Sequence, residues 1–186
     1  TAPYGYCVEK INGIYKLIVE PEAAKIVRRI FEEYASGDGI QSIIDRLFED
    51  GVHRISDYNQ YHHVYCKDGE KLHQWGNSSI RAVLNRNNYY GDLVQRKYES
   101  RFQRGEKWCD ILDESQWIIT PNAHEAIISR ELFDKAQVRL KAAQQKAAKT
   151  TAGWEEDERA FYNVFYCGDC KRKMCTRRYG NDVLYF

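Results

Sequence analysis

The chain has 186 residues, enough for one hydrophobic core or for a domain with an appendage. Charged residues make up 30% of it and the mean hydropathy is -0.69, which excludes a protein built around membrane-spanning segments. The net charge of +1 excludes an evenly basic surface, so any binding to a polyanion depends on local clusters of charge.

Positive charge is concentrated in two stretches of the sequence. The first runs from residue 78 to residue 107, and its basic residues are Arg81, Arg86, Arg96, Lys97, Arg101, Arg104 and Lys107. The second contains Lys171, Arg172, Lys173, Arg177 and Arg178. An acidic run at residues 155–158 offsets part of this charge in the total. The distribution of charge is therefore more informative than its sum.

Residues 8–19 open the chain with apolar and polar side chains that alternate around Asn12-Gly13. This dipeptide is a strong signal for a two-residue turn between antiparallel strands. The pattern predicts a small β-hairpin at the N-terminus.

Two helices follow. Pro21 stands at a first helical position and Gly37 follows the last turn, with an apolar stripe formed by Ala24, Val27, Ile30, Phe31 and Tyr34. A second stripe is formed by Ile40, Ile43, Ile44, Leu47 and Phe48, and it ends before Gly51. Because the connection is short, we expect the two helices to pack as neighbours in the manner of a helix-turn-helix.

Residues 52–74 show no clear period and read as a long irregular loop, with a strand over Tyr61–Tyr65 as one option. His62, His63, Cys66 and His73 lie in this loop and offer imidazole and thiolate groups, which are zinc ligands. Adjacent histidines on a strand point to opposite faces, which disfavours a shared ion. We therefore expect polar loop histidines, while a histidine-dependent metal nuclease is the alternative.

Residues 75–98 predict a short helix that runs into a strand. Asn77 or Ser78 can cap the first turn, and Ile80, Val83 and Leu84 form one apolar stripe. The other side of the helix carries Ser78, Arg81, Ala82, Asn85 and Arg86, with Ser79 next to them. These side chains are of the types that contact base edges and phosphates in a major groove. A merely solvated polar face is the competing interpretation.

The next segment predicts strands and a long helix. Residues 92–101 and 107–112 flank a basic tip at residues 102–106 and suggest a hairpin, and residues 117–120 suggest another strand. His124 lies in a turn and has no nucleophile or acid beside it in sequence, so we expect a hydrogen-bonded turn histidine. Ser129 can cap a helix whose stripe contains Leu132, Phe133, Ala136, Val138 and Leu140, and whose end at residues 142–149 lacks bulky apolar side chains.

The last part of the chain contains Cys167 and Cys170 in a Cys-x-x-Cys sequence with a glycine inside it. Two thiolates at this spacing can form one corner of a tetrahedral zinc site, and a zinc ribbon adds a second pair about 15 to 20 residues later. The chain ends at Phe186 without that pair, and Cys175 follows Cys170 too closely to replace it. A thioredoxin-like redox site is disfavoured because no helix follows the motif.

Taken in order, these segments resemble the C-terminal half of a large serine recombinase, the family of phage integrases and transposon resolvases. The resemblance rests on Pro3-Tyr4-Gly5-Tyr6, on residues 20–34, on Trp75 with residues 79–91, on residues 122–133, and on Cys167 to Met174. Residues 52–74 are longer than the usual connection in that family. Asn88 stands where the family commonly has proline.

The resemblance implies an α+β fold, in which a small helical domain with helix-turn-helix-like packing and β-hairpins precedes a truncated zinc-ribbon segment. The implied domains are residues 1–149 for DNA binding, 150–160 as a linker, and 161–186 as the start of a zinc ribbon. It further implies a cytoplasmic protein of bacterial or phage origin whose parent is a dimer on each site and a tetramer in synapsis. The catalytic domain would precede Thr1, so we expect this chain to be a non-catalytic part of the enzyme.

The partner implied is a double-stranded DNA attachment site, and no membrane is involved. The expected DNA-binding residues are Ser78, Ser79, Arg81, Ala82, Asn85, Arg86, Arg96, Lys97, Arg101, Arg104, Lys171, Arg172 and Arg177. Cys167 and Cys170 would hold zinc in the full-length parent, with the half-site alone binding it incompletely or not at all. The alternative from another class is a protein-interaction module in which the basic clusters are only solvated charge.

Overall fold

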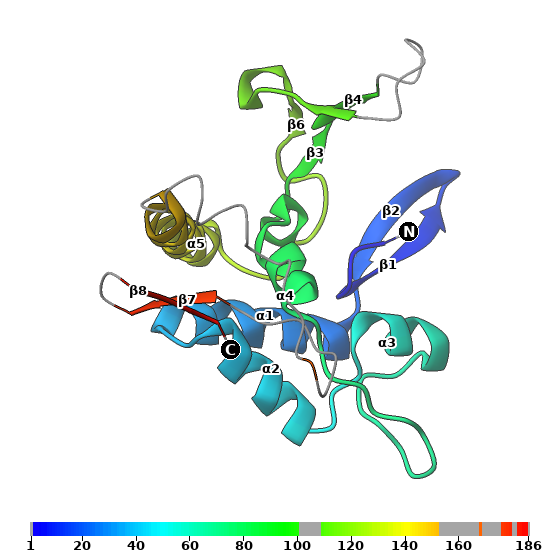
Figure 1. The fold of residues 1–186 in the computed structure, drawn as a ribbon. Coiled ribbons are helices and arrows are strands. Elements are labelled where there is room, and N and C mark those ends of the chain that lie inside the picture. Colours follow the sequence, from blue (N-terminus) through cyan, green and yellow to red (C-terminus); the bar gives the residue numbers. More distant parts are fainter. Residues whose placement is uncertain (1, 101–108, 153–167, 169–175, 180–181, 186) are drawn as a thin grey trace. The chain divides into compact units, whose positions relative to one another are not determined.

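The computed structural model describes residues 2–100, 109–152, 168, 176–179 and 182–185. The chain divides into two compact units, Thr1–Arg139 and Leu140–Phe186, with the division inside one long helix. Helices and small antiparallel strand pairs confirm the predicted α+β class (Figure 1). Within the described residues, every helix is too short or too polar to cross a membrane.

The N-terminal hairpin forms as predicted. Strand β1 (Tyr6–Ile11) pairs antiparallel with β2 (Ile14–Val19), and Ile11 lies opposite Ile14. Asn12 and Gly13 have φ angles of 51° and 84°, the left-handed values that a two-residue turn of this kind requires. Most of its side chains are exposed, so the hairpin adds little to the core except at its start, where Tyr6 is buried.

Helices α1 (Pro21–Ser36) and α2 (Ile40–Glu49) confirm the predicted helical pair. Pro21 occupies the first turn, and the backbone N–H of Gly37 closes α1 by donating to the carbonyls of Glu33 and Tyr34. The predicted apolar stripes are buried with one exception. Phe48 is 40% exposed, because it is the last apolar position of α2 and lies beyond the edge of the stripe that ends at Leu47.

The segment after α2 is more ordered than the sequence suggests. Residues 55–61 form helix α3 (Ile55–Tyr61), which the sequence analysis missed. Asp57 is the only residue of α3 that is buried, so the helix has no apolar stripe from which it could be recognised. The strand considered for Tyr61–Tyr65 reduces to a single β-bridge between Val52 and Tyr65.

Helix α4 (Asn77–Leu84) and the 3-10 helix η1 (Asn87–Tyr90) lead into a set of short strands (Figure 1). The expected hairpin is only partly correct, since the first strand breaks at Arg96, where φ is 56°. Its first half, β3 (Leu93–Gln95), pairs with β6 (Ile118–Thr120), and its second half, β4 (Tyr98–Ser100), pairs with β5 (Cys109–Ile111). A short 3-10 helix η3 (Glu114–Gln116) precedes β6. Strand β6 confirms the strand that was predicted at residues 117–120.

Helix α5 (Arg130–Ala152) begins as predicted, because the backbone N–H of Leu132 donates to Ser129 Oγ at 3.2 Å. Phe133 and Ala136 are buried, but Val138 is 70% exposed and does not belong to the apolar stripe. Beyond α5, strands β7 (Thr176–Tyr179) and β8 (Asp182–Tyr185) form a hairpin. The expected strand at residues 161–166 and the cysteines Cys167, Cys170 and Cys175 lie outside the described residues.

Candidate nucleic-acid interface

Helix α4 is attached to the core through one side. Ile80, Val83 and Leu84 are buried, as predicted from their spacing, and the helix packs against α1 and α2. At its end, the amide of Gln137 on α5 donates to the Leu84 carbonyl at 2.6 Å. These contacts fix the orientation of α4 and leave its other side exposed.

The predicted polar side of α4 faces solvent. Ser78, Arg81, Ala82, Asn85 and Arg86 are exposed, and Ser79 is partly exposed. Among residues 2–100 and 109–152, neither Arg81 nor Arg86 has a carboxylate partner within ion-pairing distance. Two positive charges on this surface are therefore not neutralised by the described part of the protein.

The ends of α4 differ from the prediction. Gly76 is the N-cap and makes no side-chain capping bond, so neither Asn77 nor Ser78 caps the helix. Asn77 lies inside the first turn, where its Oδ1 accepts a 2.8 Å hydrogen bond from Nε of Arg81. At the other end, Nδ2 of Asn85 donates to the carbonyl of Arg81 at 2.8 Å. The N-cap therefore lies one residue before Asn77. The side chains of Asn77 and Asn85 make hydrogen bonds to Arg81.

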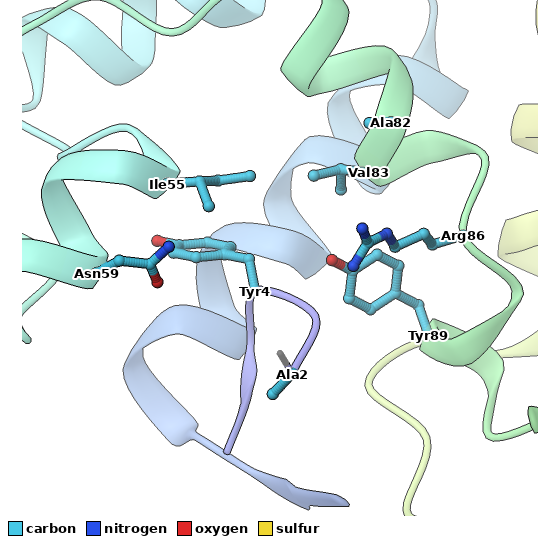
Figure 2. A pocket seen from close by; sticks show the side chains of 8 residues that line it. All are labelled: Ala2, Tyr4, Ile55, Asn59, Ala82, Val83, Arg86 and Tyr89. Atoms are coloured by element: carbon cyan, nitrogen blue, oxygen red, sulfur yellow. The ribbon is translucent and has the colours of Figure 1, made fainter. Parts of the chain in front are cut away.

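A hollow of about 190 Å³ is lined by Ala82 and Val83 of α4 and by Ala2 and Tyr4 from the start of the chain (Figure 2). Tyr4 and Tyr89 form part of its wall, and Arg86 reaches toward the Tyr89 ring. Burial raises the pKa of the Tyr89 hydroxyl above its ordinary value, although the neighbouring Arg86 acts in the opposite direction. The hollow places the Arg86 guanidinium beside neutral aromatic rings.

An aromatic cluster holds the N-terminal residues against α3 and against the segment that precedes α4. The Tyr4 ring lies edge-on to Tyr58 at 5.0 Å and to Trp75 at 5.4 Å between ring centroids. Burial raises the pKa of the Tyr4 hydroxyl, and the nearby Tyr58 adds to the shift. The Pro3-Tyr4-Gly5-Tyr6 sequence and Trp75 are thus parts of one packing unit, which the sequence alone did not reveal.

The exit from α4 is held by hydrogen bonds to the backbone of η1. The carbonyl of Asn88 accepts from the Tyr6 hydroxyl at 3.1 Å and from Nε2 of His124 at 2.6 Å, and the Tyr89 carbonyl accepts from the backbone of Ile127 and Ile128. His124 is therefore the hydrogen-bonded turn histidine that was predicted. These bonds set the direction in which the chain enters β3.

Gly91 ends η1 with a φ of 95°, a conformation that a residue with a side chain adopts only under strain. A Cβ atom at this position would lie 3.1 Å from the His124 carbonyl oxygen. The glycine therefore allows the close approach that links α4, the strands after it and the turn before α5.

The basic residues after α4 have different surroundings. Arg96 is exposed at the break between β3 and β4. Lys97 Nζ donates to Asn87 Oδ1 at 3.3 Å and lies 4.8 Å from the centre of the Trp117 ring, so part of its role is structural. Arg101 and Arg104, at the predicted hairpin tip, lie outside the described residues, as do Lys171 and Arg172. Arg177 lies on β7 of the second unit.

The four residues considered as zinc ligands from the sequence do not form one ligand cluster in the described part of the structure. His62 is exposed at the end of α3, and Nδ1 of His73 lies 2.9 Å from the Asp57 carboxylate, where it is hydrogen-bonded. Burial alone would raise the pKa of Asp57, but hydrogen bonds from His73 and Arg54 outweigh it and hold that pKa below its ordinary value. Only His63 of the proposed set belongs to a cluster, which it forms with His53 and Glu70.

Comparison with known protein families shows that the model of the Recombinase family matches residues 21–143 of this chain. The match extends from α1 into α5 and includes α4 with all the strands of the first unit after it. It covers well over half of the sequence.

Two solved structures are similar to the chain at low sequence identity. The first, described as "Crystal Structure of a LSR-DNA Complex", is 19% identical with a TM-score of 0.46, and the match covers 95% of this chain and 42% of that chain. The second, described as "Sequence Requirements of the Listeria innocua prophage attP site", is 17% identical with a TM-score of 0.45 and coverages of 98% and 61%. This chain thus spans less than two thirds of the length of either structure.

Proposed function

The chain belongs to the Recombinase family, and from this premise we propose that its helical domain binds the DNA attachment site of a serine site-specific recombinase. In this proposal the domain positions a catalytic domain of the parent enzyme at the site for integration or excision. The chain itself binds DNA without cutting it.

The observation that carries the proposal is the exposed side of α4. Arg81 projects from a short helix whose apolar side is buried, and the exposed Asn85 and Arg86 follow its last residue. The described residues leave both arginines without a carboxylate partner. An α-helix fits into the major groove of B-form DNA, where Arg reads guanine and Asn reads adenine through paired hydrogen bonds. We assign α4 as the helix that enters the groove.

Phosphate contacts would come from the basic residues around α4 and in the second unit. Arg96 is exposed directly after β3, and Arg101 and Arg104 follow it in the sequence. Lys171, Arg172 and Arg177 supply the second cluster. Contacts of this type fix the register of a protein on the duplex without reading its sequence, and they make affinity depend on salt.

The finer assignments extend the same proposal to the parent protein. Cys167 and Cys170 would form half of a zinc-ribbon site that a further cysteine pair completes. The parent would bind each attachment site as a dimer and bring two sites together as a tetramer. Binding within the bacterial or phage-infected cytoplasm follows from this role.

A DNA-selection experiment tests the proposed function. Duplexes that contain a randomised segment are selected on the full chain, and fluorescence anisotropy then measures affinity for the selected duplex and for a scrambled duplex of equal length across a salt series. We expect the selected site to bind about 10³-fold or more tightly than the scrambled one, with an affinity that falls steeply as salt rises.

Three results would contradict the proposal. A protein-interaction module would yield no enriched sequence and no steep dependence of affinity on salt. Equal affinity for selected and scrambled duplexes would remove the sequence-specific role of α4. Cleavage of the duplex that a chelator abolishes would instead support a metal nuclease.

A further inference from the structure

The segment between α2 and α4 holds a cluster of three potential metal ligands, and we propose that His53, His63 and Glu70 form a zinc site. The proposal concerns the stability of this segment and is independent of DNA binding. It uses a different ligand set from the one that the sequence suggested.

The ligand atoms already converge on one position. Nε2 of His53 lies 3.1 Å from Oε2 of Glu70, and Nε2 of His63 lies 2.8 Å from the same oxygen. One ligand atom from each of the three residues lies within 4.8 Å of the others. Around a tetrahedral zinc ion with bonds of about 2.0 to 2.1 Å, neighbouring ligand atoms are about 3.3 Å apart. The two nitrogen-to-oxygen distances are close to this value, and the two imidazole nitrogens, which lie within 4.8 Å of each other, would adjust by side-chain rotation to admit the ion.

In the absence of an ion, three nitrogen atoms lie around one carboxylate oxygen of Glu70. Besides the two imidazoles, the backbone N–H of Lys67 donates to the same Oε2 at 2.9 Å. Three nitrogen atoms therefore surround one carboxylate oxygen, which has two lone pairs. With a cation between the three side chains, each imidazole would direct a lone pair at the ion instead of an N–H at the oxygen. The crowding on Oε2 would then be relieved.

The backbone holds both histidines in place before any ion binds. The N–H of His53 donates to the Val64 carbonyl at 2.8 Å, and the Val52–Tyr65 bridge lies next to this bond. His53 and His63 therefore lie on facing backbone segments. The Tyr61 ring stacks on the His53 ring with centroids 5.0 Å apart, which fixes its orientation. A pre-formed ligand set of this kind reduces the cost of binding.

The protonation and exposure of the cluster suit a metal. A glutamate carboxyl group is ionised at neutral pH and can bind a cation, and a neutral imidazole offers a lone pair. The His53 side chain is fully buried, whereas those of His63 and Glu70 are 21% and 19% exposed. An ion can enter from the exposed side, and a water molecule can complete its coordination. Two histidines, a glutamate and a water molecule are an established zinc donor set.

The position of the site indicates what the ion would do. Of the α3 residues, only Asp57 is buried, so this helix buries little apolar surface beyond the contact of Tyr58 with the Tyr4 ring. A zinc ion would join His53, next to the end of α2, to His63 and Glu70, which follow α3. It would thereby close the chain around α3 and brace the connection that leads to Trp75 and α4.

Zinc titration of the full chain in a Cys167→Ser/Cys170→Ser background tests this proposal, because the substitutions remove the thiolates that would otherwise bind zinc. The protein is stripped with a chelator under reducing conditions, and ZnCl₂ is added in competition with a chromophoric chelator. We expect one zinc ion to remain bound per chain after gel filtration. We also expect the melting temperature to rise by several degrees.

Variants of the ligands and a matched control locate the ion. Glu70→Gln keeps the shape of the side chain, and His63→Gln removes a partly exposed imidazole, so both should fold and lose the bound zinc. His62→Asn is the control, since His62 is exposed, its φ is 58°, and asparagine tolerates that conformation. It should bind zinc as tightly as the parent background.

Three outcomes overturn the proposal. If the Cys167→Ser/Cys170→Ser background retains no stoichiometric zinc, the cluster is a hydrogen-bonded group only. If Glu70→Gln and His63→Gln retain zinc as the control does, the ion lies elsewhere. Cobalt substitution adds a further check, because His and carboxylate ligands give no thiolate charge-transfer band. Such a band would show that Cys66 or another thiol is a ligand and would refute the assigned set.

Discussion

At the scale of single residues, Arg81 of α4 and Asn85, which directly follows this helix, are hydrogen-bonded before any partner is bound. Arg81 donates to Asn77, and Asn85 donates to the carbonyl of Arg81. Both side chains are exposed, so these bonds compete with water and cost little to exchange. The helix thus presents ordered but available groups, which reduces the side-chain entropy lost when they contact a base.

The first prediction concerns Arg81→Ala. Loss of a bidentate base contact should weaken binding to the selected duplex by about 1 to 3 kcal/mol and relax the base preference at one position. Anisotropy titrations against single-base variants of the duplex measure both effects. Lys25→Ala, an exposed lysine of α1, is the control and should leave the preference unchanged. Full affinity and unchanged preference in Arg81→Ala would exclude the groove assignment.

The second prediction concerns Glu70 and acid. Because its folded-state pKa of about 2 lies below the ordinary 4.5, ionised Glu70 stabilises the fold above about pH 4.5. That contribution should be lost as the pH falls from 4.5 toward 2. Glu70→Gln should therefore have a lower melting temperature than the wild type at neutral pH and a smaller difference from it in acid. Circular dichroism melts with a chelator present measure this, and a pH-independent difference would contradict it.

At the scale of elements, the orientation of α4 depends on its neighbours at both ends. Its apolar stripe packs on α1 and α2, and Gln137 of α5 caps its last turn. Helix α5 is in turn fixed to α1, because the Arg139 guanidinium donates to the carbonyls of Tyr34, Gly37 and Asp38. A cation at the C-terminal end of α1 also complements the helix dipole. The exposed side of α4 is thus set by three other helices.

The third prediction compares two apolar substitutions. Leu84 is fully buried on the apolar side of α4, so Leu84→Ala should lower the free energy of unfolding by about 2 to 5 kcal/mol. Val138 is 70% exposed, so Val138→Ala should change it by less than about 0.5 kcal/mol. Urea unfolding of both variants measures these values. A large effect of Val138→Ala would mean that a partner covers this side of α5.

The fourth prediction concerns the strand segment after α4. If Arg101 contacts a phosphate, Arg101→Ala should weaken binding to selected and scrambled duplexes alike. The slope of log affinity against log salt should flatten by about one unit. Salt titrations with both duplexes measure it. A loss confined to the selected duplex would instead assign Arg101 to base recognition.

At the scale of the whole molecule, the net charge of +1 conceals an uneven distribution. Basic residues are concentrated in residues 78–107 and 171–178 of the sequence, while acidic residues are concentrated at 155–158. The two basic clusters belong to different compact units of the chain. Long-range attraction to DNA therefore depends on local potential and should fade beyond about 10 Å at 0.1 M salt.

The fifth prediction tests the contribution of the second unit. The triple variant Lys171→Ala/Arg172→Ala/Arg177→Ala should bind selected and scrambled duplexes more weakly by the same factor. Its salt slope should fall by up to about three units, because each lost phosphate contact removes about one released ion. The ratio of the two affinities should not change. A changed ratio would show that this cluster reads the sequence.

The spacing of apolar residues, together with the residues that begin or end helices and turns, predicted most of the helices and strands. Helix α1 could be bounded by Pro21 and Gly37, the first hairpin could be centred on Asn12 and Gly13, and the buried stripe of α4 followed from its spacing. These features are local, since they depend on backbone preferences and on the repeat of the helix or strand. The family resemblance, confirmed over residues 21–143, added the order of the segments.

Only the tertiary structure decided which distant residues meet. Helix α3 has almost no apolar face, β3 pairs with β6 instead of continuing into a long hairpin, and His63 meets His53 and Glu70 instead of His73 and Cys66. Each outcome depends on contacts between segments that are separated in sequence, which no local repeat encodes. The sequence thus determined α4 and the face it exposes, while packing decided what surrounds that face and where a metal could bind.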